Sequence, residues 1–131
     1  MDQPQAGRVI LLGSGETSPN IRKTYDWLFQ QLEKPVSISI LETPAGFEPN
    51  CEDVARQIGD YLEKHLQNFN PQISLIPARR RGTDYSPDDA SLLEPIYGSS
   101  VILMGPGSPT YTVSKLQESV AWPTMHARHR M

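Results

Sequence analysis

The sequence predicts an α/β fold in which a parallel sheet lies between two layers of helices. Two observations lead to this prediction. Short apolar runs alternate along the chain with segments whose apolar residues recur at helical spacing, and such alternation produces right-handed crossovers and a parallel sheet. In addition, long loops rich in glycine and proline follow the apolar runs, whereas short connections precede them. Ligands of open α/β sheets bind at the carboxyl ends of the strands, so this asymmetry predicts a site on that edge.

The predicted strands are four short apolar runs: Val9–Leu12, Val36–Leu41, Ile73–Ile76 and Val101–Met104. The first and the last are uninterrupted, which is typical of strands buried on both faces. The loops that follow the four strands read GSGETSP, ETPAGFEPN, PARRRGTDYSP and GPGSP.

Four amphipathic segments are the predicted helices. The first has one apolar face made of Ile21, Tyr25, Leu28, Phe29 and Leu32. The second follows Asn50, a suitable N-cap, and its apolar stripe consists of Val54, Ile58, Tyr61, Leu62, Leu66 and Phe69. A third begins at Ser86 and is ended or kinked by Pro95. A fourth begins after Ser108.

Length and composition limit the class of protein. The 131 residues are 37% hydrophobic and 21% charged, a balance that suits one packed domain spanning residues 1–131. The net charge of −3 gives no overall field for nucleic acid. No apolar run approaches the ~20 residues of a membrane helix, and the residues after Met1 do not resemble a signal peptide. The single cysteine, Cys51, excludes an internal disulfide and makes a zinc site unfavourable. We therefore expect a cytoplasmic protein with no membrane, metal or cofactor partner.

The first loop allows three interpretations. Glycines between a strand and a helix suggest dinucleotide binding, but Ser18 stands where that fingerprint requires a third glycine. The loop could also be a simple flexible turn. The third interpretation is a substrate-facing loop built from Gly13, Ser14, Gly15 and Glu16.

Two further features have a functional and a plain interpretation. Arg79, Arg80 and Arg81 could clamp a carboxylate or phosphate through paired hydrogen bonds, or they could form an ordinary solvated charge run. Cys51 lies at the predicted start of a helix, where the dipole favours a thiolate. No histidine is near it in sequence, so a half-buried inert thiol is the alternative.

The segment VILMGPGSPTY, residues 101–111, resembles the oxyanion strand of class I glutamine amidotransferase-like domains. The other strand ends, VILLGSGETSP, ILETPAGFEPN and IPARRRGTDYSPDD, look like successive loops of relatives of cyanophycinase and dipeptidase E. Those relatives are serine peptidases that act on aspartate-containing peptides. The resemblance implies a flavodoxin-like sheet with strand order 2-1-3-4 and with Val9–Leu12 as the central strand.

The resemblance also implies roles for the last loop. Gly105 would donate its backbone N–H to an oxyanion, and Gly107 and Ser108 would shape the turn. Glycine permits close backbone approach and proline stiffens such a loop. The alternative is a plain glycine-rich turn in which Ser108 caps the next helix.

In the family the nucleophile sits on a tight turn after the next strand, and residues 122–131 contain no such strand or turn. The resemblance thus implies the amino-terminal portion of a hydrolase for small acidic or amide substrates, inactive alone for lack of a nucleophile. The alternative is a small non-enzymatic module that binds an anionic molecule or a protein through its strand-end loops. An amino-terminal portion should leave the edge of the Val101–Met104 strand open, and we expect self-association through it, whereas a self-sufficient module should cover that edge.

Overall fold

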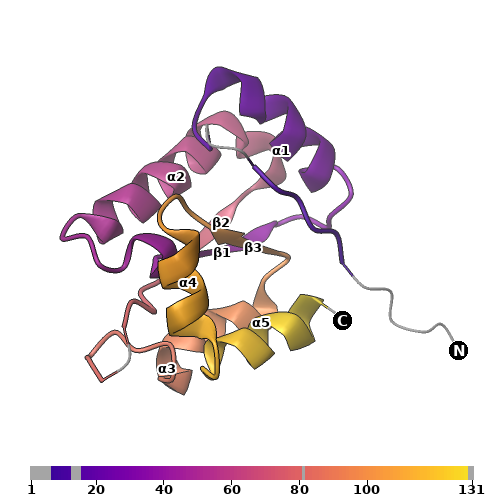
Figure 1. Ribbon diagram of the computed structural model, residues 1–131. Coiled ribbons are helices and arrows are strands. Elements are labelled where there is room, and N and C mark those ends of the chain that lie inside the picture. The colour runs from indigo at the N-terminus through magenta and orange to yellow at the C-terminus, as the bar shows by residue number, and fades with distance from the viewer. Residues whose placement is uncertain (1–6, 13–15, 81, 130–131) are drawn as a thin grey trace, which may run out of the picture.

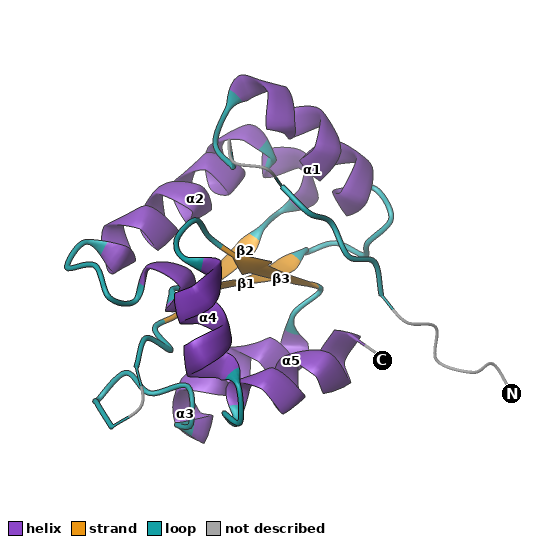
Figure 2. Ribbon diagram, viewed as in Figure 1, coloured by secondary structure: helices purple, strands orange, loops and turns teal. Residues whose placement is uncertain are grey.

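A computed structural model describes residues 7–12, 16–80 and 82–129 of the chain. Its three strands form one parallel sheet in the order β2-β1-β3. They are β1 (Ser37–Leu41), β2 (Gln72–Ile76) and β3 (Val101–Met104). In the register of the sheet, Ile38 of β1 lies opposite Ile73 on one side and Val101 on the other. Figure 2 shows this sheet between two groups of helices, so the predicted α/β class is confirmed.

The helices divide between the two faces of the sheet (Figure 1). One face carries α1 (Arg22–Phe29) and α2 (Cys51–His65), and the other carries α3 (Ala90–Leu93) and α5 (Ala121–His129). The eight-residue helix α4 (Pro109–Leu116) follows β3 and packs on a 3-10 helix at Thr43–Ala45. Further 3-10 helices lie at Pro19–Ile21, Gln67–Phe69 and Glu94–Gly98. In the described part of the chain, no helix has the length and apolar character to cross a bilayer.

Each face of the sheet has its own core. Ile38 and Ile40 of β1 point to the α1/α2 layer, where they meet Phe29 and Leu62. Leu41 points to the opposite layer and packs with the cluster that includes Met125 of α5. Alternate residues of a strand face opposite sides, so a central strand must be buried on both faces, and β1 is.

The predicted first strand requires correction. Residues 7–12 form no strand, and β1 takes the central place that the resemblance implied for Val9–Leu12. The physical reason is burial: Val9 is 72% exposed and Leu11 is 91% exposed, whereas a central strand is covered on both faces. The order β2-β1-β3 keeps the 2-1-3 pattern expected of a flavodoxin-like sheet, but shifted by one segment along the chain.

Helix boundaries also differ in detail from the sequence prediction. Asn50 precedes α2 without capping it through its side chain. The second helix ends at His65, and Asn70, with φ 49°, closes the following 3-10 turn. Asp89 caps α3 by accepting a hydrogen bond from the Ser91 amide at 2.9 Å. Pro95 does end α3, because a 3-10 helix follows from Glu94.

Candidate functional site

The loops that follow the three strands meet at the carboxyl edge of the sheet. The Thr43 hydroxyl after β1 donates to the carbonyl of Ala78 after β2 at 2.5 Å. The Ser108 amide after β3 donates to the carbonyl of Pro44 at 2.9 Å. Long strand-end loops have therefore folded into one connected platform, at the edge where open α/β sheets bind ligands.

The GPGSP loop packs through its backbone against the loop that follows β1. Gly107 has φ 154°, a conformation that side chains rarely adopt. A Cβ at this position would lie 2.0 Å from the carbonyl oxygen of Pro44 and 2.7 Å from the amide nitrogen of Ala45. Both neighbours are backbone atoms, so no rotamer change relieves the clash. Glycine is thus required here because two strand-end loops touch through their main chains.

A small cavity of about 150 Å³ opens beside this loop. Its lining consists of Pro44, Met104, Gly105, Gly107, Ser108, Pro109 and Thr112. Within the described residues, the amides of Gly105 and Gly107 donate to no carbonyl or side chain. Two unpaired N–H groups beside a cavity are suited to hold a carbonyl oxygen or an oxyanion.

Ser108 has a different role from these glycines. Its hydroxyl oxygen accepts a hydrogen bond from the Tyr111 amide at 3.1 Å and so caps α4. Its own amide is engaged by Pro44. Ser108 thus fixes the turn between the loop and the helix, as either interpretation of the sequence allowed.

Arg79 does not present a free cation to the site. Its Nε and Nη2 donate to Oε1 of Glu42 at 3.1 and 2.7 Å, and its guanidinium lies 4.4 Å from the ring centre of Tyr85. Partial burial disfavours the charged guanidinium, but the hydrogen bonds and charge of Glu42 outweigh it and raise the pKa of Arg79. Arg80 is exposed and donates its amide to the Tyr85 carbonyl at 3.0 Å. Arg81 lies outside the described residues, so the anion clamp of three arginines stays a prediction.

The first loop is attached to the α1/α2 layer. The Tyr25 hydroxyl donates to the Glu16 carbonyl at 3.0 Å, and the Tyr61 hydroxyl donates to the Ser18 carbonyl at 2.9 Å. Burial raises the pKa of Tyr25 to about 12, so this hydroxyl stays a donor. The other three predicted residues of this loop, Gly13, Ser14 and Gly15, lie outside the described residues.

Cys51 is a buried thiol, with only 3% of the residue exposed. Burial raises its pKa, while nearby Arg79 lowers it and Glu42 raises it further. Among the described residues, no hydrogen bond joins a serine or cysteine side chain to a histidine.

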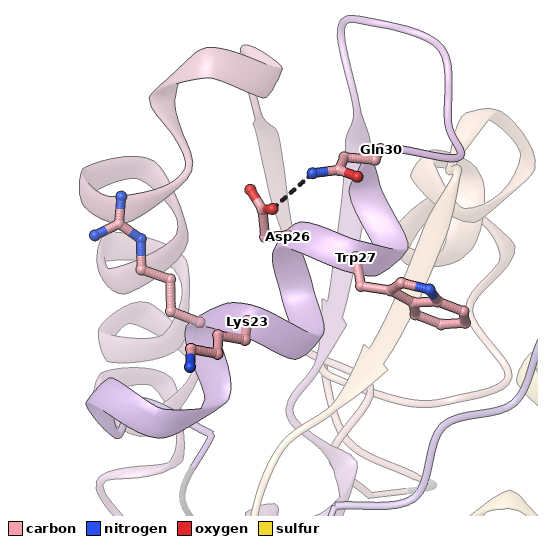
Figure 3. Close-up of a pocket in the computed structure, with 5 residues that line it drawn as sticks. Lys23, Asp26, Trp27 and Gln30 are labelled. Carbon is pink, nitrogen blue, oxygen red and sulfur yellow. Dashed lines mark hydrogen bonds between the residues drawn. The ribbon is translucent and has the colours of Figure 1, made fainter.

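A larger hollow of about 330 Å³ lies on the outer side of α1. It is lined by Arg22, Lys23, Asp26, Trp27 and Gln30. Figure 3 shows Trp27 pointing away from Asp26, which accepts a hydrogen bond from Gln30 at 2.7 Å. None of these residues belongs to a strand-end loop, so this surface hollow is separate from the candidate site.

The Glu42–Arg79 pair was not foreseen from the sequence. Its two members are 37 positions apart, and the only sequence signal was that each closely follows a predicted strand. The described residues contain no group of three or more His, Cys, Asp or Glu side chains arranged to hold a metal ion.

Comparison with known proteins gives a structural relative. No family model and no curated sequence matches the chain. The crystal structure of a peptidase from an acI-B1 actinobacterium superimposes with a TM-score of 0.77 at 21% sequence identity. The match covers 98% of this chain and 52% of that one, so the chain spans about half the length of the peptidase. The likeness shows that the chain shares the α/β fold of the matching part of that protein.

Proposed function

We propose that this chain supplies the carbonyl-binding part of a peptidase-like hydrolase. The observation that carries the proposal is the pair of unbonded amides, Gly105 and Gly107, beside the cavity at the carboxyl end of β3. Oriented backbone donors stabilise the negative charge that develops on a carbonyl oxygen during attack. The fold shared with a peptidase supports the same chemistry. We infer an amide or a peptide as the substrate class, because the GPGSP loop resembles that of amidotransferase-like domains.

The nucleophile of this reaction comes, in this proposal, from outside the described residues. The described part assembles no serine or cysteine with a histidine base. Cys51 is buried with a raised pKa, so it is poorly suited to attack. The non-enzymatic alternative is that the arginine run binds an anion. The guanidinium of Arg79 is paired with Glu42, which makes it less suited to bind such an anion.

The binding role is tested by titrating acetate and acetamide against the isotope-labelled protein. We expect the amide resonances of Gly105 and Gly107 to shift saturably, while the Ser108 amide, already bonded to Pro44, shifts little. The variant Gly105→Pro lacks one donor and should weaken binding by about 10-fold, the loss expected for one hydrogen bond to a charged or polar ligand. Gly105→Ala is the matched control, because it keeps the N–H and its Cβ meets only the flexible end of Ile58.

The proposal fails if both probes shift residues elsewhere and leave Gly105 and Gly107 unmoved. It fails equally if Gly105→Pro binds acetate as tightly as Gly105→Ala does. Loss of binding in both variants would show a steric effect of the Cβ and would remove Gly105 as a donor.

The chain by itself should not hydrolyse amide or aspartyl-peptide substrates. An oxyanion donor without a nucleophile cannot attack a carbonyl. The measurement is product release by mass spectrometry after long incubation of purified protein. Reproducible turnover that disappears in a Cys51→Ala variant would contradict this expectation and would make the buried thiol the nucleophile.

A further inference from the structure

We propose that the Glu42–Arg79 ion pair is a positioning pair, which holds the GPGSP loop, with the amides of Gly105 and Gly107, beside the cavity. This inference rests on the proposed carbonyl-binding function. It gives Arg79 a role that differs from contact with an anionic substrate.

The pair is fixed in place on both sides. The Glu42 side chain is only 2% exposed and its single described cationic partner is Arg79. A buried carboxylate is costly unless it is paired and hydrogen-bonded, so the guanidinium is held where the carboxylate lies. The Tyr85 ring packs against the same guanidinium, and the backbone of Arg79 is held as well, because its amide donates to the Tyr85 carbonyl at 2.7 Å.

Hydrogen bonds link the backbone of Arg79 to the loop after β3. The Arg79 carbonyl accepts a hydrogen bond from the Tyr111 hydroxyl at 3.1 Å. The Tyr111 amide donates to the Ser108 hydroxyl oxygen at 3.1 Å, and the Ser108 amide donates to the Pro44 carbonyl at 2.9 Å. Pro44 is two residues beyond Glu42. The contacts form a closed ring through the loops of all three strands, and the turn that contains Gly107 is part of it.

Stability alone does not account for such a pair. Buried ion pairs are often replaceable by apolar residues at no loss of stability, whereas breaking one partner is harmful because it leaves an unpaired charge. Here the pair lies in a ring whose remaining members are the cap of α4 and the contact between Ser108 and Pro44. Its specific contribution is therefore the position of the loop.

The test compares Arg79→Gln, the double variant Glu42→Gln with Arg79→Gln, and Arg79→Lys. Arg80→Gln is the matched control, because this neighbouring arginine is exposed. Two readouts are used: amide hydrogen exchange at Ser108, and the affinity for acetate seen at the Gly105 and Gly107 resonances. We expect exchange at Ser108 to become about 10-fold faster in Arg79→Gln and in the double variant, with weaker acetate binding in both. Arg79→Lys should restore part of each, and Arg80→Gln should match the wild type.

A purely structural pair would give another result. The double variant leaves no unpaired charge. If the pair serves stability alone, a double variant that melts at the wild-type temperature should also show wild-type hydrogen exchange at Ser108 and wild-type acetate binding. That result overturns the proposal, as does equal behaviour of Arg79→Gln and Arg80→Gln. If the wild type binds no acetate, the carbonyl-binding function fails, while Ser108 exchange still decides whether the pair positions the loop. If Arg79→Gln does not fold, Arg79→Lys and the double variant are compared with the wild type by the same two readouts.

Discussion

Replacing Gly107 with alanine should lower the free energy of unfolding by about 2–4 kcal/mol and displace the GPGSP loop. Two costs combine at this position. The backbone has φ 154°, which strains any residue with a Cβ, and the added methyl group would lie 2.0 Å from the Pro44 carbonyl oxygen. The loop must move away from Pro44 to make room. That movement breaks the hydrogen bond from the Ser108 amide and removes Gly107 from the cavity.

Alanine substitutions at two other glycines measure the backbone strain and the steric clash separately. Gly82 has φ 75° with no atom within 4 Å of an added Cβ, so Gly82→Ala carries only the backbone strain. Gly98 has open space around the added Cβ and no positive φ, so Gly98→Ala carries neither cost. Urea unfolding of the three variants gives the comparison, and the resonances of Gly105 and Ser108 report on the loop. A Gly107→Ala protein as stable as Gly98→Ala, with an unmoved Ser108 amide, would show that the loop contact with Pro44 is dispensable.

The second large effect concerns the outer edge of β3, through which we expect two copies of the chain to associate. The Ser100 amide donates to the Ser37 carbonyl of β1 at 2.8 Å. Because successive N–H groups of a strand point to opposite sides, the amides of Val101 and Leu103 face away from β1. In the described residues β3 pairs with β1 alone. An open edge without charge or proline is a template for strand pairing.

A second copy is the occupant that this edge suits. Antiparallel pairing of two β3 strands about a two-fold axis places only Val101, Ile102, Leu103 and Met104 opposite one another, so no like charges meet. Met104 is 44% exposed and adds apolar surface at the carboxyl end of the strand. The melting temperature should therefore rise with protein concentration, since association stabilises the folded chain by mass action.

The substitution Val101→Pro tests this edge directly. Proline is tolerated at the first residue of a strand and on the side that faces outward, so the pairing with β1 is kept while an outward donor is lost. Val101→Ala is the control, because it removes a similar apolar contact but keeps the N–H. Sedimentation over a concentration series should show association for the wild type and Val101→Ala, and a monomer for Val101→Pro. A wild type that stays monomeric, with a concentration-independent melting temperature, would refute association through β3.

Local sequence pattern was sufficient for much of the fold. The strands at Ser37–Leu41, Gln72–Ile76 and Val101–Met104 follow from apolar runs between turn residues. Helix α2 follows from an apolar stripe at helical spacing, and the Ser108 cap follows from a serine before a proline. These features depend on side chains within a few positions of one another, because the periods of strands and helices are properties of neighbouring residues. The long loops after the strands likewise indicated where the candidate site lies.

Only the tertiary structure decided which run is central and what each loop residue contacts. Val9–Leu12 is as apolar as β3, yet it remains outside the sheet, because a central position requires cover on both faces and β1 has that cover. The arginine run allowed the interpretation of an anion clamp. No sequence rule shows that Glu42 lies against Arg79, and only the structure reveals this pair. In the same way, the GPGSP motif indicated a glycine-rich turn but not why Gly107 is required. The Pro44 carbonyl, which leaves no room for a Cβ at Gly107, belongs to a loop far away in sequence. Pairing and close approach are set by distance in space, and the chain brings these loops together only when the sheet has formed.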